Sequence, residues 1–224
     1  MTVSANLQEI RSNIRQACAN SNRNPEEITI IGVTKYVTIE RTEETINAGI
    51  NDLGENRLEG FLEKHEHFQD QAKWHFIGTL QSRKVKDIID KVDVIHSLDR
   101  LSLAKEINKR TTVPIDCFVQ VNVSGEKSKH GLSPDTVITF LNDVQTYENI
   151  RVVGLMTMAP HVNDEKLLRD TFRQLATLRS AIQQENLPQA PCHYLSMGMS
   201  NDYQIAIEEG ATHIRIGSKL VGTN

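Results

Sequence analysis

The sequence has few cysteines, little net charge and no long apolar run, and each shortage excludes a class of protein. Its three cysteines, Cys18, Cys117 and Cys192, are odd in number and far apart, which argues against a disulfide framework or a zinc site and favours reduced thiols. No apolar stretch approaches the ~20 residues that span a bilayer, and the amino-terminal segment lacks the apolar core of a signal peptide. We therefore expect a cytoplasmic protein with no membrane segment.

The overall charge also argues against some partners. A net charge of −4 gives no general attraction to nucleic acid or to an anionic membrane. With 38% hydrophobic and 24% charged residues, the composition is that of an ordinary globular protein. No linker, repeat or low-complexity tract divides the chain, so residues 1–224 are expected to form one domain.

Short apolar strands alternate with helical segments along almost the whole chain. The eight expected strands are 28–34, 52–54, 74–77, 92–97, 115–123, 152–156, 193–197 and 213–217. The clearest helices between them are 57–68, 100–108, 134–144, 165–184 and 202–209. An additional helix is expected at the amino terminus, with Ser4 as its N-cap and with an apolar stripe of Leu7, Ile10, Ile14 and Ala17.

This alternation predicts the fold. Alternating strands and helices imply a parallel sheet with right-handed crossovers. Eight such units in about 200 residues predict a closed (β/α)8 TIM barrel with an extra N-terminal helix, and an open doubly wound sheet is the alternative. In such a barrel, chemistry gathers at the carboxyl ends of the strands, where this chain carries its most unusual residues.

Lys35 ends the first expected strand, a run rich in β-branched residues. Side chains alternate along a strand, so Ile31, Val33 and Lys35 share one face. If that face points into the core, an amine stands at the mouth of an apolar cavity. Desolvation there weakens its hold on the proton and favours a Schiff base with a carbonyl compound. A strand-end lysine that extends into water is the alternative.

Two glycine- and serine-containing turns follow the seventh and eighth strands. The candidate residues in and beside these turns are Ser196, Gly198, Met199, Ser200, Gly217 and Ser218. Gly198 permits close backbone approach, and Ser200 is expected to cap the next helix. Free N–H groups at two adjacent helix starts favour an anion, so the two turns together predict a phosphate cup. Ordinary capping is the alternative for either turn alone.

Three further residues at strand ends are candidates for ligand contact. Arg215 lies two residues before the second turn, so its guanidinium is expected deeper in the barrel than the phosphate cup. A buried arginine needs an acceptor, which is either a ligand atom or a carboxylate such as Asp52 or Glu55. Asn56 offers an amide after the second strand, and Met156 is expected to pack in the interior, including against a ligand ring.

Two histidines and one loop have no assigned chemistry. His75 and His96 fall at or near strand ends, where a histidine is more often a buried structural residue than a catalytic base. The polar loop 124–131 is either a solvated connection or a partial cover over the mouth of the barrel.

Several segments belong to strings that match a known family almost from end to end. They are VTK at 33–35, GEN at 54–56, WHFIGTLQSRK at 74–84, IHSLD at 95–99, QVNVSGE at 120–126, GLM at 154–156, LSMGMS at 195–200 and RIGS at 215–218. With these strings the chain resembles the pyridoxal 5′-phosphate (PLP) homeostasis protein family. The WHFIG and LSMGMS strings are highly specific, whereas GEN or RIG alone is weak. Arg83 and the ending 220–222 depart from the family pattern, away from the implied ligand contacts.

The resemblance implies a barrel similar to the cofactor domain of alanine racemase, with PLP bound as a Schiff base on Lys35. It implies phosphate held around residues 198–200 and 217–218, Arg215 facing the pyridine nitrogen, and Asn56 near the ring. It further implies a monomer whose partners are PLP and PLP-dependent apoenzymes.

The chemistry that the resemblance implies is that of a carrier rather than an enzyme. PLP is the strongest electron sink when its ring nitrogen is protonated, and an arginine only donates, so it keeps that nitrogen unprotonated. The chain also ends directly after the expected barrel, without the further β domain that supplies a tyrosine base in alanine racemase-like enzymes. The main hypothesis is a protein of intracellular PLP homeostasis that buffers or delivers the cofactor and influences the balance of amino and keto acids. A weakly active racemase-like enzyme and a PLP-free class I aldolase are the alternatives.

Overall fold

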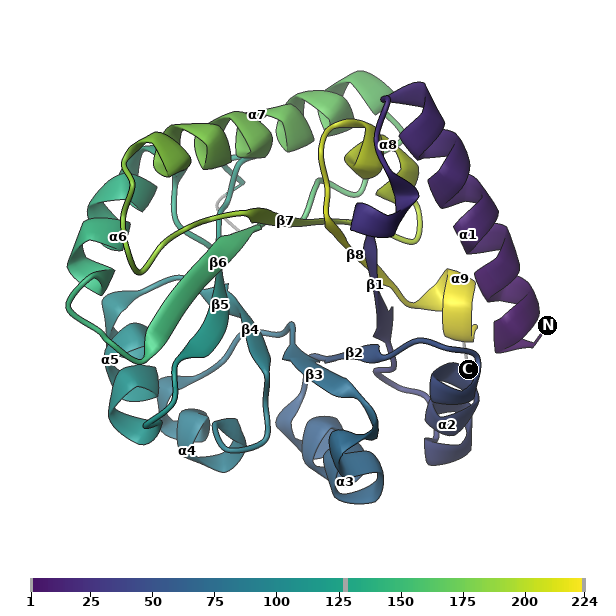
Figure 1. Cartoon of the computed structure of the whole chain (residues 1–224), viewed down its shortest axis with the longest axis horizontal. Coiled ribbons are helices and arrows are strands. Elements are labelled where there is room, and N and C mark those ends of the chain that lie inside the picture. Colours follow the sequence, from purple (N-terminus) through teal and green to yellow (C-terminus); the bar gives the residue numbers. More distant parts are fainter. Residues whose placement is uncertain (1, 127–128, 223–224) are drawn as a thin grey trace.

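Eight parallel strands close into a barrel in which each strand pairs with the next and β8 returns to β1 (Figure 1). The computed structural model describes residues 2–126 and 129–222. The strands are β1 (Thr29–Val33), β2 (Asp52–Glu55), β3 (Lys73–Phe76), β4 (Val94–Leu98), β5 (Ile115–Gln120), β6 (Ile150–Met156), β7 (Tyr194–Met199) and β8 (His213–Ile216). The predicted (β/α)8 TIM barrel is confirmed, and the open doubly wound sheet is excluded.

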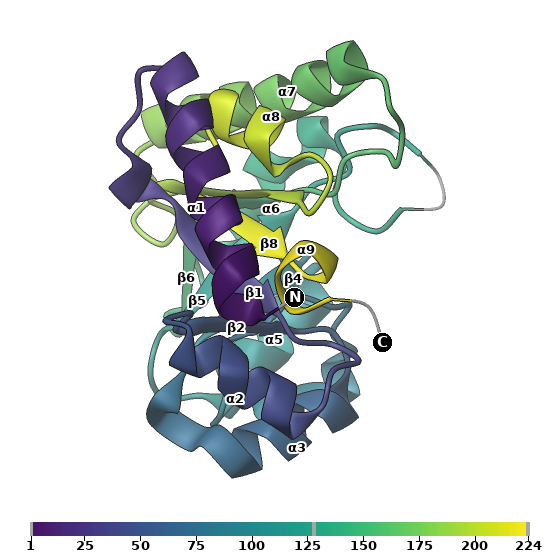
Figure 2. The same ribbon diagram turned by 90° about the vertical axis from the view of Figure 1, so that its right-hand side faces the viewer.

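The helices lie outside the barrel (Figure 1). They are α1 (Val3–Asn20), α2 (Ile39–Asn47), α3 (Leu58–Phe68), α4 (Val85–Ile88), α5 (Leu101–Arg110), α6 (Val137–Val144), α7 (Glu165–Gln184), α8 (Tyr203–Glu208) and α9 (Ser218–Val221). Short 3-10 turns cover Pro25–Glu27, Gln69–Gln71, Ser82–Lys84 and Pro134–Thr136. Figure 2 shows the extra amino-terminal helix α1 along α8 and α9, so the first and last helices complete the outer layer together.

The predicted apolar stripe of α1 is buried. Its members are at most 4% exposed: Leu7, Ile10, Ile14 and Ala17. The start of the helix differs from the prediction, because the hydroxyl of Thr2 accepts a hydrogen bond from the Ala5 N–H. Thr2 is therefore the N-cap, and Ser4 lies in the first turn.

Two strands end more than one residue away from the predicted position. β5 stops at Gln120: the Val121 N–H still donates to the Met156 carbonyl oxygen of β6, whereas the Asn122 N–H donates to the carbonyl oxygen of Leu132 in the following loop. β7 continues to Met199, with an irregular register against β8 between Ser196 and Met199. In the loop 124–131, residues 127 and 128 lie outside the described residues.

Apolar side chains form two separate layers. A large cluster lies between strands and helices, and a small cluster inside the barrel consists of Val94, Phe118, Val153 and Met156. The barrel interior also contains polar side chains that are at most 5% exposed, namely His75, His96, Ser196 and Arg215. Bulky branched side chains normally fill such interiors, so these polar groups call for a functional explanation.

Candidate functional site

A cavity of about 520 Å³ opens at the carboxyl ends of the strands. Its walls come from the ends of β1, β2, β3, β5, β6, β7 and β8 and the loops that follow them, where TIM barrels place their active sites. Eight of the candidate residues line this cavity: Lys35, Asn56, Met156, Met199, Ser200, Arg215, Gly217 and Ser218. The structure thus brings most of the predicted site together.

Ser196 and Gly198 are not among the residues that line the cavity. Ser196 is fully buried and bound to Arg215, so it lies behind the cavity wall. Gly198 has a φ of +91°, and a Cβ atom there would lie 2.6 Å from the Cβ of Ala206 in α8. Gly198 therefore lets α8 pack closely against the end of β7.

Lys35 lies in the turn directly after β1, and its side chain is exposed. It lines the main cavity and also a smaller cavity of about 340 Å³, so it stands where the two meet. Its Nζ is 5.7 Å from the ring centroid of Tyr36, a residue with a φ of +67°. Lys35 lies at the mouth as expected, and its exposure matches the alternative of a lysine that extends into water rather than a desolvated amine.

A buried polar cluster lies behind the ends of β1 and β2. The Lys64 ammonium donates to Glu55 Oε1 and to the carbonyl oxygen of Thr34, each at 2.7 Å. The Thr34 hydroxyl donates to the same Glu55 oxygen at 2.7 Å. Since Thr34 and Glu55 directly precede Lys35 and Asn56, the cluster fixes two strand ends from which the next residues line the cavity.

Asn56 carries a polar atom that lacks a partner. Its Oδ1 is buried and has no hydrogen-bond partner within residues 2–126 and 129–222, although a buried amide oxygen normally has one. The neighbouring loop lies very close, because a Cβ on Gly78 would be 2.1 Å from the Asn56 backbone oxygen. A ligand in the cavity is a natural donor for Asn56 Oδ1.

Arg215 lies on the floor of the cavity and is 5% exposed. Its Nη1 donates to Ser196 Oγ at 2.6 Å, and its Nη2 donates to the Thr157 carbonyl oxygen at 2.8 Å. Burial lowers the pKa of Arg215 to about 10, against the opposite influence of the Asp202 charge. Arg215 therefore stays cationic at neutral pH.

The carboxylates considered for Arg215 bind other groups. Glu55 pairs with Lys64, and Asp52 Oδ1 accepts from His75 Nε2 at 2.9 Å. The barrel salt bridge considered as the alternative is therefore wrong. Two of the five guanidinium N–H donors serve Ser196 and Thr157, which leaves donor capacity beside the cavity.

The turns after β7 and β8 contact each other. Ser200 Oγ accepts a hydrogen bond from the Lys219 N–H at 3.4 Å, and both turns contribute serines to the cavity wall. The prediction that Ser200 caps α8 is wrong, because Asp202 is the N-cap residue and its Oδ1 accepts from the Met199 N–H. Ser200 and Ser218 thus lie at the cavity, as a phosphate cup requires.

Sequence reasoning missed part of the wall. The residues it did not name as ligand contacts include Ile77, Gly78 and Thr79 after β3, Met158, Ala159, Pro160 and His161 after β6, and Asn201 and Asp202 after β7. The specific WHFIGTLQ string was the available signal for the first group. The segment after β6 has no comparable signal.

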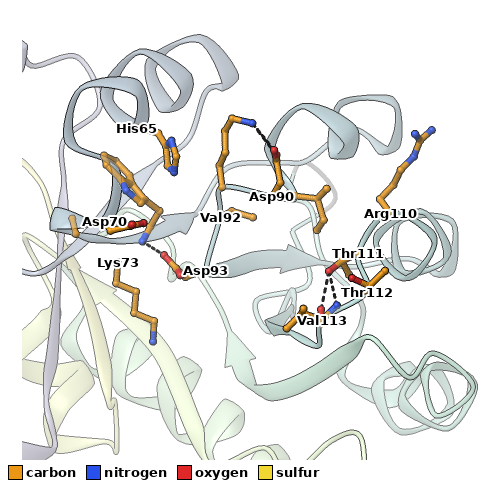
Figure 3. A pocket seen from close by; sticks show the side chains of 14 residues that line it. His65, Asp70, Lys73, Asp90, Val92, Asp93, Arg110, Thr111, Thr112 and Val113 are labelled. Carbon is orange, nitrogen blue, oxygen red and sulfur yellow. Dashed lines mark hydrogen bonds and ion pairs between the residues drawn. The ribbon is translucent and has the colours of Figure 1, made fainter.

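A larger cavity, of about 690 Å³, lies at the opposite end of the barrel, around the start of β3 (Figure 3). Its lining charges are of both signs, and several of them bind nearby groups. Lys91 pairs with Asp90 at 2.8 Å, and Asp93 accepts the Trp74 N–H at 2.6 Å (Figure 3). None of the candidate ligand residues lines this cavity, so the cavity of about 520 Å³ at the carboxyl ends of the strands is the candidate site.

Within residues 2–126 and 129–222, no group of three His, Cys, Asp or Glu side chains is placed to hold a metal ion. No helix in the same part of the chain is long and apolar enough to cross a membrane. Cys18, Cys117 and Cys192 are buried free thiols, and burial raises the pKa of Cys192 to about 12.

Fold and cavity together define the class of protein, a (β/α)8 barrel with a lysine at a ligand cavity on the carboxyl side. The family model described as "Alanine racemase, N-terminal domain" matches residues 5–224. The pyridoxal phosphate homeostasis protein of Aquifex aeolicus is 40% identical over 226 residues, which are 99% of this chain and 98% of that protein. The chain therefore belongs to the alanine racemase N-terminal domain family and, within it, to the pyridoxal phosphate homeostasis proteins, as predicted.

Solved structures agree with this assignment. PipY of Synechococcus elongatus, in a structure with PLP bound, is 28% identical with a TM-score of 0.85, over 98% of this chain and 100% of that chain. Alanine racemase from Corynebacterium glutamicum has a TM-score of 0.73 at 11% identity, over 97% of this chain and 59% of that chain. The second likeness shows the shared barrel fold alone.

Proposed function

We propose that this protein binds PLP in the 520 Å³ cavity, as a Schiff base on Lys35, and serves PLP homeostasis as a carrier without efficient turnover. The observation that carries the proposal is the convergence in one cavity of a lysine, two serine-bearing turns and a buried arginine without a carboxylate partner among the described residues. The relatives' names and the PLP-bound PipY structure support it.

The residues present fit this cofactor. PLP supplies an aldehyde that condenses with an amine and an aromatic ring that withdraws electrons. Lys35 would offer the amine at the mouth, and Ser200 and Ser218 would donate hydroxyl hydrogen bonds to the phosphate. The unpartnered Oδ1 of Asn56 would accept a ligand donor, and Met156 would pack against the ring.

Arg215 supports the carrier role. It lies deeper in the cavity than the serine turns and carries a permanent positive charge at neutral pH. A guanidinium has no lone pair to offer a protonated ring nitrogen and can only donate to an unprotonated one. Such a contact favours the weaker electron sink, which suits holding the cofactor rather than stabilising a carbanion.

Borohydride reduction followed by peptide mass mapping tests the attachment. We expect a pyridoxyl adduct on Lys35 and no adduct in Lys35→Ala, which should keep the fold because the side chain is exposed. Lys84→Ala, at another lysine on the same side of the barrel, is the matched control and should keep the adduct. An adduct on a different lysine would refute the assignment. Failure to bind PLP would favour the alternative of a PLP-free class I aldolase.

The proposal also covers how the carrier acts. We propose a monomer in the cytoplasm that passes PLP to PLP-dependent apoenzymes, since its cysteines are buried free thiols suited to a reducing compartment. Analytical ultracentrifugation would measure the mass in solution and so test whether the protein is a monomer. Transfer would be tested by mixing the loaded protein with an excess of an apoenzyme, since a carrier should activate it faster than free release of PLP allows.

A further inference from the structure

A row of hydrogen-bonded side chains crosses the barrel interior and ends at Arg215. Arg215 Nη1 lies 2.6 Å from Ser196 Oγ, which lies 3.0 Å from His96 Nδ1. His96 Nε2 lies 2.9 Å from His75 Nδ1, and His75 Nε2 lies 2.9 Å from Asp52 Oδ1. The five residues come from β8, β7, β4, β3 and β2, so no single segment of the sequence contains the row.

The row leads away from the cavity into the protein. Arg215 lines the cavity, whereas Ser196, His96 and His75 are fully buried. Asp52 begins β2, and its side chain is 24% exposed. The row therefore connects the cavity floor with the amino-terminal end of the barrel, opposite the proposed ligand site.

Two arrangements of protons satisfy every link, because a hydroxyl oxygen can accept two hydrogen bonds. In the first arrangement, Ser196 Oγ accepts from Arg215, which only donates, and directs its own proton toward His96 Nδ1. His96 then carries its proton on Nε2 and donates to His75 Nδ1. His75 likewise carries its proton on Nε2 and donates to the carboxylate of Asp52, which only accepts. In the second arrangement, His75 carries a proton on each nitrogen, and His96 donates from Nδ1 to Ser196 Oγ, which then accepts from both sides.

His96 is neutral in both arrangements, and its surroundings favour that state. Burial is the main cause that lowers the pKa of His96 well below its ordinary value, and the nearby His75 and Arg215 add to it. His96 stacks on Phe118 at 4.4 Å between ring centroids, and Phe118 meets His213 edge to face. Asp52 has a pKa below its ordinary value, because the His75 hydrogen bond and nearby positive charges outweigh the effect of burial.

We propose that Ser196, His96, His75 and Asp52 adopt the first arrangement, a one-way hydrogen-bond relay that positions Arg215 and sets how strongly the cavity selects a ligand with an acceptor nitrogen at its floor. These four are positioning residues that act through Arg215. Successive hydrogen bonds polarise one another in a low-dielectric interior, so the Asp52 carboxylate makes Ser196 Oγ a better acceptor for the guanidinium. The selectivity part of this inference rests on the proposed binding of PLP.

The first test measures the relay directly, without cofactor. Nitrogen-15 NMR of the wild-type protein should show His75 and His96 both neutral and both protonated on Nε2. Their ring N–H protons should exchange slowly with solvent, since both rings are fully buried. Protonation of either ring on Nδ1, or a charged imidazole at neutral pH, would overturn the one-way arrangement.

The second test measures selectivity. The probes are PLP and its 1-deaza analogue, in which a carbon replaces the ring nitrogen. Wild type should prefer PLP, and Ser196→Ala should reduce this preference by about tenfold, because a charge-assisted hydrogen bond to Arg215 is lost. Ser97→Ala is the matched control, since Ser97 is also buried and its hydroxyl makes no hydrogen bond within the described residues.

A graded series at Asp52 separates the relay from simple packing. Asp52→Asn keeps an acceptor without charge and should retain more of the preference than Asp52→Leu, although neither change touches the cavity. If the ratio of the affinity for PLP to that for the 1-deaza analogue is unchanged in Ser196→Ala and Asp52→Leu, the selectivity role is refuted. Failure of the wild type to bind PLP would instead refute the proposed function, while the NMR result would still decide whether the relay exists.

Discussion

The ammonium group of Lys64 lies 2.7 Å from the backbone carbonyl oxygen of Thr34, the residue directly before Lys35. The same ammonium lies 2.7 Å from the carboxylate of Glu55, the residue directly before Asn56. The side chains of Lys64 and Glu55 are 4% and 2% exposed, so solvent screens their attraction little. One buried ion pair outside the barrel thus fixes two strand ends at the ligand cavity.

Lys64→Met should destabilise the protein because it leaves the Glu55 carboxylate buried without its cation. Removing one partner of a buried pair costs about 3–5 kcal/mol of unfolding free energy, which urea denaturation would measure. Replacing both partners, as Lys64→Met with Glu55→Leu, should restore much of that loss. Lys84→Met is the control, since its Nζ lies 3.9 Å from an exposed Glu59 carboxylate and should contribute less than about 1 kcal/mol. Equal losses in both single variants would contradict the special role of the buried pair.

Ser200→Ala and Ser218→Ala should weaken PLP binding while leaving pyridoxal binding almost unchanged. Each hydroxyl would donate a charge-assisted hydrogen bond to phosphate, worth about 1.5–3 kcal/mol, so each loss should cost roughly tenfold or more in affinity. Fluorescence titration with both ligands measures the two affinities. Equal affinity of the wild type for PLP and pyridoxal would show that the two turns form no phosphate cup.

The fully buried His96 and the half-buried His213 predict acid sensitivity. Burial is the main cause that lowers the pKa of His213 to about 3 and that of His96 well below its ordinary value. The folded protein keeps both rings neutral, whereas the unfolded chain takes up protons near the ordinary histidine value of about 6.5. Their contribution to stability is therefore complete above that value and is lost progressively as the pH falls toward the folded-state values, by about 1.4 kcal/mol per pH unit for each group.

His213→Phe tests this dependence. The variant removes one titrating group from a ring cluster that already contains Phe118 and Tyr194. Urea denaturation at a series of pH values below neutrality should show a slope smaller by up to about 1.4 kcal/mol per pH unit. The exposed His67→Phe is the control. The same slope in wild type and His213→Phe would show that His213 does not resist protonation in the folded state.

The barrel and the position of its mouth could be predicted because they depend on local patterns. Short apolar strands alternating with helices indicated the fold, and the unusual residues at strand ends indicated where the cavity lies. Lys35 was placed correctly at the mouth, but its exposure depends on the turn after β1, where Tyr36 has a φ of +67°. No residue pattern indicated that turn.

The supporting contacts could not be predicted because they join distant parts of the chain. Lys64 bonds to Thr34, 30 residues away, and Ser196 bonds to His96, 100 residues away. The closed barrel brings such residues together, and nothing in the local sequence marks them as partners. The position of Arg215 below the serine turns followed from its place in the eighth strand. Its acceptors, Ser196 and the Thr157 carbonyl, were not identified, because they lie on other strands or loops.

Arg215 should suppress turnover of amino acids by bound PLP. Because a guanidinium cannot accept a proton from the pyridine nitrogen, bound PLP should stabilise substrate carbanions poorly. We expect no efficient racemisation, transamination or decarboxylation by the wild type. Arg215→Glu would place an acceptor beside that nitrogen and favour its protonated form, so α-proton exchange of amino acids should rise if PLP is retained.

Exchange of α-deuterium in heavy water, with several amino acids, compares wild type with Arg215→Glu. Arg215→Met is the control, because it removes the donor without supplying an acceptor and should not raise exchange. The absorption spectrum confirms in each case that PLP is bound. Wild-type exchange at ordinary enzyme rates, on the order of 1–10³ per second, would contradict the carrier and favour a racemase-like enzyme. If Arg215→Met accelerates α-proton exchange as much as Arg215→Glu, then Arg215 does not limit exchange by keeping the ring nitrogen unprotonated.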